Sequence, residues 1–215
     1  MPSLILEDCE SDNITDPVTI RRLFLEDSEW ERTSNSWKEL KPIRDFNIFR
    51  VSDETPQECC NRLWGRFEIP LEVIDQWLFK LYYKRESTNN YGWLDFDRIG
   101  FEFTKLSVRQ LMGTKVIQEY SQWVENTEKR TPFSDFTCSQ KDKAHWLENG
   151  TWRVPPVILD VSTLANLSIP EYADIRGPLQ LVEGHTRMGY LRAVYRAGMA
   201  IESDLHSVYR MYLRG

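Results

Sequence analysis

The spacing of apolar residues is clearest in two stretches of the chain, 70–84 and 115–126. In each stretch, large apolar side chains recur three and four residues apart, which is the spacing of a helix that buries one face. The first stripe consists of Ile74, Trp77, Leu78, Leu81 and Tyr82, and the second of Val116, Ile117, Tyr120, Trp123 and Val124. We interpret the aromatic residues of the first stripe as core rather than as a ligand site.

Shorter patterns predict further elements. Asp16-Pro17 and Thr55-Pro56 each begin a helix, because a capping side chain precedes a proline at the first helical position. Glu58 completes a capping box with Thr55. In the first half of the chain we also expect a strand over 45–51, a loop over 87–90, a half-exposed strand within 91–104 and a helical turn over 107–111. A loop or boundary over 127–142 and a helix over 141–148 that stops at Asn149-Gly150 follow. The last expected element is a helix that is capped by Ser203-Asp204 and carries Leu205, Val208 and Tyr212.

Two short apolar runs of strand type lie between these last two helices. Pro155-Pro156 forces an extended entry into the first run, which Asp160 ends. The second run, 179–182, leads into a polar turn over 183–186, and a helical spacing of apolar residues then continues from Arg187 to Gly198. We therefore predict a strand, a glycine turn and a helix over 179–198.

A strand, a glycine turn and a helix N-terminus together form a geometry that binds anions. The turn exposes backbone N–H groups, the helix dipole favours negative charge, and Gly184 allows a ligand to approach closely. Arg187 could add a bidentate phosphate contact, and without a ligand its partner would be Glu183 or Asp160. We predict that the phosphate-binding residues are Gly184, Thr186, Arg187 and Asp160, and that the catalytic residues are Glu183 and His185. The competing interpretation is a salt bridge and a histidine that only shapes the turn.

Composition limits the class of protein. The chain has 215 residues, of which 41% are hydrophobic, enough for one large domain or two small ones. A net charge of −6 argues against unaided binding of a nucleic-acid duplex, which would need a local basic patch. The four cysteines lack metal-ligand spacing, and no stretch approaches the ~18 apolar residues of a membrane span. We expect a cytoplasmic protein with reduced thiols that does not enter a membrane.

Two other groups of residues invite a functional interpretation. Asp95, Asp97 and Glu102 could bind a metal or transfer protons, but their alternation with apolar residues is typical of a half-exposed strand. Trp152 and Arg153 could pack on a nucleotide base, but ordinary packing explains them as well. We prefer the structural interpretation for both groups.

From Pro155 to Gly198 the sequence resembles the ParB/sulfiredoxin superfamily. The resemblance rests on the PPVILD strand, an intervening loop and the segment LQLVEGHTRMGYLRA, where Gly184 and Arg187 fit the family's Gly-x-x-Arg turn. It implies that this turn holds nucleotide phosphates, with a nucleoside triphosphate and Mg²⁺ as ligands, and that the reaction is nucleotide hydrolysis or phosphoryl transfer.

The chain also departs from this family. Sulfiredoxin-like members place a cysteine directly after the glycine, where this chain has His185, so we do not expect sulfinic-acid reduction. ParB-like partition members usually have two basic residues in the turn, where this chain has Thr186 for one of them. They also add a helix-turn-helix domain, for which the 17 residues after Gly198 leave no room.

These observations predict an α+β fold. Residues 136–215 would form a small mixed sheet of ParB/sulfiredoxin type, and a mainly helical region, 1–135, would pack on it, as a second region or as part of one integrated domain. The alternative to a nucleotide-binding protein is a catalytically inactive interaction module of a bacterial regulatory, mobile-element or defence system. The helical N-terminal region would then bind a protein partner.

Overall fold

A four-stranded mixed sheet lies at the centre of the molecule. The computed structural model describes residues 30–43 and 54–215, so the helix expected at Asp16-Pro17 and the strand expected over 45–51 lie outside the described residues. The strands are β1 (Ile99–Ser107), β2 (Val157–Asp160), β3 (Leu179–Glu183) and β4 (Leu205–Leu213), in the spatial order β1-β4-β2-β3. β4 pairs antiparallel with β1 and parallel with β2, whereas β2 and β3 are antiparallel. The mixed sheet confirms the α+β fold class.

Strand β4 corrects the final helix that the sequence predicts. Nine residue pairs join it to β1, from Leu205 opposite Ser107 to Leu213 opposite Ile99. Its neighbouring residues Val208 and Tyr209 belong to two different hydrophobic clusters. A strand that is buried on both faces has no clean alternation of apolar and polar residues, and its apolar positions can therefore imitate helical spacing.

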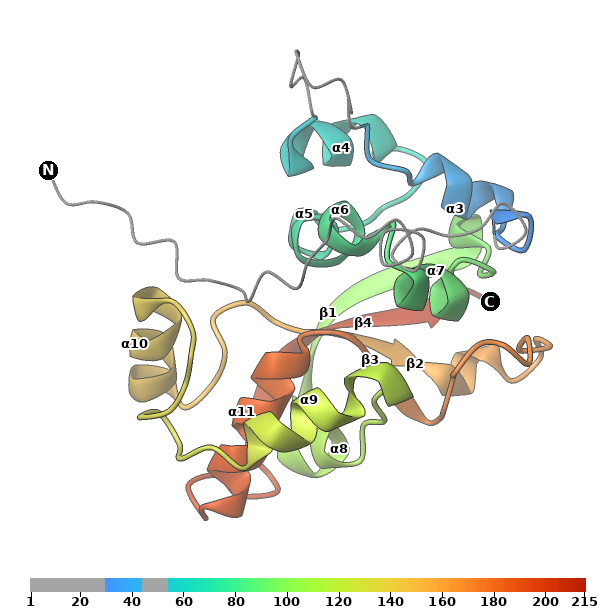
Figure 1. Ribbon diagram of the computed structural model, residues 1–215. Helices are drawn as coiled ribbons and strands as arrows, with labels where there is room; N and C mark the ends of the chain where they lie inside the picture. Colours follow the sequence, from blue (N-terminus) through green and yellow to red (C-terminus); the bar gives the residue numbers. More distant parts are fainter. Residues whose placement is uncertain (1–29, 44–53) are drawn as a thin grey trace, which may run out of the picture.

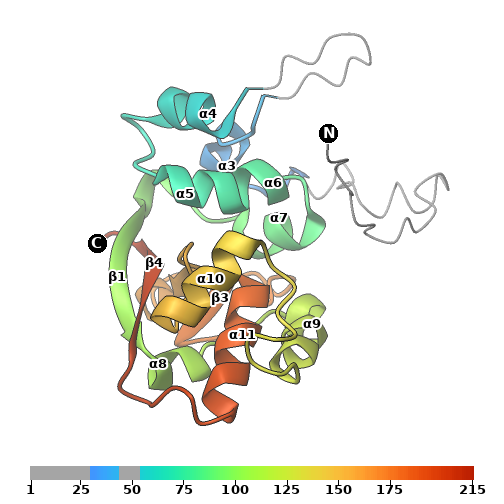
Figure 2. The ribbon, with the colours of Figure 1, turned by 90° about the vertical axis from the view of Figure 1, so that its left-hand side faces the viewer.

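Helices cover both faces of the sheet, so the molecule has three layers (Figure 1). One layer contains α3 (Asn35–Glu39), α4 (Pro56–Leu63), α5 (Leu71–Val73), α6 (Phe79–Leu81) and α7 (Arg85–Tyr91). The other contains α8 (Val108–Met112), α9 (Gln118–Glu128), α10 (Gln140–Asn149) and α11 (His185–Arg196). Figure 2 shows the same two layers from the side, with α4, α5 and α6 on one side of the sheet and α8, α9 and α11 on the other.

The two faces of the sheet belong to two hydrophobic cores. Val157 and Leu159 of β2 pack with the first helical layer, whereas Ile158 between them packs with the second. Leu181 and Val182 of β3 divide between the two cores in the same way. Burial of the sheet on both faces is therefore what joins the two helical layers.

The first helical layer contains one long helix with an irregular turn. The predicted helix over 70–84 is found as α5, the π-helical segment η1 (Ile74–Leu78) and α6. Within η1 the backbone N–H of Phe79 donates to the carbonyl of Ile74, five residues back, which is the π-helical bond. The capping box of Thr55 and Glu58 starts α4 as expected.

Helix α7 corrects the loop expected over 87–90. Its polar side chains Ser87, Thr88 and Asn90 are buried and hydrogen-bonded, which composition alone does not reveal. The hydroxyl of Ser87 accepts a hydrogen bond from Nε1 of Trp77 at 2.9 Å, and the hydroxyl of Thr88 donates to the carbonyl of Tyr82 at 3.0 Å. Tertiary hydrogen bonds thus stabilise a helix rich in turn-forming residues.

The remaining elements follow their local signals. Helix α8 begins with a capping box of Ser107 and Gln110, and α10 ends at Gly150, which is left-handed with φ of +65°. Short 3₁₀ segments, η2 (Phe96–Arg98) and η3 (Val161–Leu164), lead into β1 and out of β2.

The strand expected within 91–104 begins only at Ile99, so Glu102 alone of the acidic cluster lies in β1, and each of the three carboxylates has a structural partner. Asp95 caps η2, Asp97 pairs with Arg66 at 2.7 Å, and Glu102 pairs with Arg210 at 2.7 Å. Among the described residues no group of three histidine, cysteine or acidic side chains could hold a metal ion. Nor is any helix in the described part of the chain long and apolar enough to cross a membrane.

Candidate functional site

Gly184 forms the sharp turn between β3 and α11, as the sequence predicts. It is the N-cap residue of α11 and has φ of +105°, a conformation that L side chains rarely adopt. A Cβ atom at this position would lie 2.6 Å from Cβ of Pro156. The glycine is therefore required by the backbone conformation and by its close approach to Pro156. The helix begins at His185, two residues before the expected start.

Arg187 lies in the first turn of α11 and crosses to the opposite helical layer. Nη1 donates to the carbonyl of Val154 at 2.8 Å, and Nη2 donates to Oε1 of Gln76 at 2.7 Å. The Glu183 carboxylate is farther away, at 3.5 Å from Nη2. Burial lowers the pKa of the Arg187 guanidinium. The negative charges of Glu183 and Asp142 oppose part of this decrease. The short hydrogen bonds of this largely buried cation, whose side chain is 20% exposed, thus go to uncharged acceptors.

His185 is buried between an acidic and an aromatic side chain. Its Nδ1 lies 3.8 Å from Oε2 of Glu183, and its ring centroid lies 4.3 Å from that of Tyr120 on α9. Its Nε2 is buried without a hydrogen-bond partner among the described residues. The structure therefore brings the two predicted catalytic residues together and adds an aromatic neighbour.

Thr186 connects the turn to α9. Its hydroxyl accepts a hydrogen bond from Nε1 of Trp123 at 3.0 Å. The indole of Trp123 is nevertheless largely exposed, with 56% of its surface accessible. A hydrogen bond to the turn therefore holds a large exposed aromatic ring beside it.

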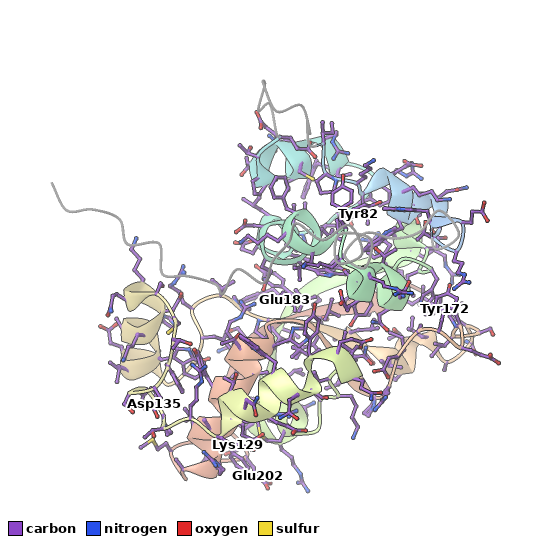
Figure 3. All side chains as sticks on the ribbon, in the orientation of Figure 1. Tyr82, Lys129, Asp135, Tyr172, Glu183 and Glu202 are labelled. Atoms are coloured by element: carbon purple, nitrogen blue, oxygen red, sulfur yellow. The ribbon has the colours of Figure 1, made fainter. Side chains whose placement is uncertain are left out.

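Two cavities meet at the turn. The larger cavity, of about 520 Å³, lies between the turn and α9, and the smaller cavity, of about 400 Å³, lies between the turn, η1 and α10. Glu183, Thr186 and Arg187 line both cavities. Figure 3 shows Glu183 near the centre of the molecule, where the end of β3 meets the first helical layer and α11. The turn therefore separates two spaces that could hold different parts of one ligand.

Asp160 lies away from this site, which corrects its assignment as a ligand residue. It pairs with Leu179 at the beginning of β3, whereas Val157 pairs with Glu183 at the end. Because β2 and β3 are antiparallel, Asp160 and Glu183 lie at opposite ends of the pair. Asp160 instead caps η3, where it accepts from the backbone N–H of Ser162 at 3.2 Å.

Sequence reasoning misses several residues that line the site. Gln76 stands on the polar side of its predicted helix, four residues from Glu72 and from Lys80, so no local signal distinguishes it. Tyr120 and Trp123 were predicted for the core face of their helix and instead line the larger cavity. Three charged residues of the smaller cavity also lacked a local signal: Asp75, Lys80 and Asp142. Trp152 and Arg153, which the sequence offered as residues that could pack on a base, line this cavity as well.

Comparison of the chain with protein-family models, with curated proteins and with solved structures finds no match.

Proposed function

We propose that the turn from Glu183 to Arg187 binds the phosphate groups of a nucleotide. The single observation that carries this proposal is the position of Arg187, whose side chain is only 20% exposed and lies at the junction of two cavities. Its two short hydrogen bonds go to Val154 and Gln76, both uncharged. A buried cation is costly unless an opposite charge answers it. The 3.5 Å contact with Glu183 provides only part of that charge, and a phosphate would provide more.

The backbone of the turn provides a second reason to expect an anion there. No side chain caps the N-terminus of α11, so its first backbone N–H groups are available to an anion. Membership of the ParB/sulfiredoxin superfamily belongs to the same proposal. It is supported by the Gly-x-x-Arg turn and by the pairing of the two strands that carry the resemblance.

The chemistry of the turn also supports a reaction. Oε2 of Glu183 lies 3.8 Å from Nδ1 of His185, which is longer than a hydrogen bond, so a small shift on ligand binding would have to bring the pair together for proton transfer. Nucleotide hydrolysis or phosphoryl transfer would use this pair. The residues that the structure describes do not build a metal site of their own, so Mg²⁺ would enter with the phosphates and with Glu183 as one ligand.

Calorimetry with the four common nucleoside triphosphates, with and without Mg²⁺, tests the proposal. We expect one of them to bind, and we expect Arg187→Ala to weaken that binding roughly 10- to 150-fold, because a charge-assisted contact contributes about 1.5 to 3 kcal/mol. Arg187→Lys keeps the charge without the forked geometry and should lose part of the affinity.

Arg196→Ala is the matched control, because Arg196 is exposed at the other end of the same helix. Thermal unfolding of each variant separates loss of the site from loss of the fold. Absence of heat and of a thermal shift with every triphosphate would refute the nucleotide proposal.

An inactive interaction module is the second candidate. The observation that favours it is the exposure of large apolar side chains in the first helical layer, 67% for Trp64 at the end of α4 and 55% for Ile43. A partner protein that covers these side chains would remove their apolar surface from water. This function would be favoured if no nucleotide binds.

A further inference from the structure

The two cavities differ in chemistry. The larger cavity is lined mainly by apolar and aromatic surface from Leu81, Tyr120 and Trp123. Its only charged residues in the described part of the chain are Glu119, Glu183 and Arg187, so acidic groups outnumber basic ones there. A polyphosphate placed wholly in the larger cavity would meet two carboxylates and one guanidinium.

The smaller cavity offers more positive charge. Lys80, Arg153 and Arg187 line it, and the carboxylates of Asp75, Asp142 and Glu183 balance them, whereas acidic groups exceed basic ones in the larger cavity. Lys80 lies 3.5 Å from Asp75, and Arg153 lies 2.7 Å from Asp142. Both basic side chains are about half exposed, at 59% and 48%. Ion pairs of this exposure are weak, so a multivalent anion can compete for the two cations.

The aromatic wall of the larger cavity suits a flat ring. Trp123 is held in place by its hydrogen bond to Thr186, yet much of its ring remains accessible. A nucleobase that stacks on a preorganised indole gains contact area and pays little conformational entropy. Tyr120, which packs on His185, forms the wall next to it.

These differences orient the ligand. Resting on the proposed nucleotide site, we infer that the base occupies the larger cavity against Trp123 and that the first phosphate lies at the junction, against the Glu183–Arg187 turn. The remaining phosphates extend into the smaller cavity toward Arg153 and Lys80. Gln76 supports this junction from η1, because its side chain binds Arg187 at 2.7 Å and the carbonyl of Pro155 at 3.0 Å. Trp123, Lys80 and Arg153 thereby become ligand-binding residues.

Two probes and two substitutions test this orientation. The probes are the nucleoside triphosphate that the wild-type protein binds best and inorganic tripolyphosphate, which lacks the base and the sugar. Trp123→Ala should weaken binding of the nucleotide about 5- to 150-fold, the range expected for one stacked base, and should leave the affinity for tripolyphosphate within about twofold. Arg153→Gln should weaken the binding of both probes by a similar factor, because the phosphates of both would lie in the smaller cavity.

Control variants distinguish stacking from general effects. Trp64→Ala and Arg109→Gln make the same chemical changes at exposed positions that line neither cavity, and they should leave both affinities unchanged. Trp123→Phe keeps a ring but removes the hydrogen bond to Thr186, and it should retain more nucleotide affinity than Trp123→Ala.

The possible failures can be told apart. If no triphosphate binds the wild-type protein, the proposed nucleotide function itself is refuted. If a triphosphate binds but tripolyphosphate does not, or if Trp123→Ala weakens both probes equally, the orientation is overturned and the nucleotide site stands. An unchanged affinity of both probes in Arg153→Gln overturns the orientation as well.

Discussion

At the scale of single residues, Gly184 meets two requirements that can be separated by experiment. Its φ of +105° excludes most side chains, and Pro156 lies where a Cβ atom would be placed. Gly198, at the end of α11, shares the first requirement with φ of +71° but has open space around the position of a Cβ atom. Comparison of the two glycines therefore isolates the effect of the close approach.

Gly184→Ala should destabilise the protein by about 2 to 4 kcal/mol, the sum of a left-handed backbone and an overlap with Pro156. Gly198→Ala should lower the free energy of unfolding only by the cost of the left-handed backbone, about 1 to 2 kcal/mol. Urea unfolding of the two variants measures both quantities. Equal losses of stability would show that the contact with Pro156 adds nothing.

Sequence reasoning identified the residues of the site whose roles are local. Gly184 stands out because a turn needs it, and His185, Thr186 and Arg187 follow it directly. Gln76 was missed because its partner Arg187 is 111 residues away. Asp160 was misplaced because the direction in which two strands pair is not encoded within either strand.

At the scale of elements, α9 and α11 approach each other closely at Gly189. A Cβ atom there would lie 2.6 Å from Cβ of Thr127 and 3.1 Å from the carbonyl oxygen of Val124. Alanine normally stabilises a helix interior by about 1 kcal/mol relative to glycine. The packing of α9 reverses this preference, because a backbone carbonyl cannot move aside without moving the helix.

Gly189→Ala should therefore lower the free energy of unfolding by about 1 to 2 kcal/mol, against its helix propensity. Chemical denaturation measures this, with Gly113→Ala as the control, because the nearest atom there is 3.4 Å from the added Cβ. Since α9 carries Tyr120 and Trp123, the displacement of α9 should also weaken the binding of any ligand in the larger cavity. A more stable Gly189→Ala protein would contradict the close helix contact.

Elements with strong end signals were predictable, whereas those defined by distant partners were not. Thr55 with Glu58 and the Asn149-Gly150 stop determine helix ends through neighbours in sequence. Strand β4 is a strand because β1, about a hundred residues earlier, and β2 pair with it. Pairing over such a separation leaves little trace in the local pattern.

At the scale of the whole molecule, the sheet crosses the boundary proposed at residue 135. Strand β1 comes from the first range, 1–135, and the other three strands from the second. The boundary stays a prediction, but both cores take side chains from both ranges. The two ranges therefore depend on each other for burial.

A fragment of residues 136–215 should not fold alone, because it exposes one edge of β4 and loses the first helical layer. Its circular dichroism and amide NMR spectra should be those of an unfolded chain. Mixing it with a fragment of residues 1–135 should restore native signals. A well-dispersed spectrum from the short fragment by itself would contradict this expectation.

The π-helical turn at Ile74–Leu78 has an evolutionary consequence. A π turn arises when one residue is inserted into an α-helix, and the insertion turns the residues around it to a different face. Here it accompanies the placement of Gln76 against Arg187 and of Asp75 in the smaller cavity. Deleting one residue of the segment would rotate Gln76 away from Arg187. In related chains, the insertion and the arginine of the turn should therefore be gained and lost together.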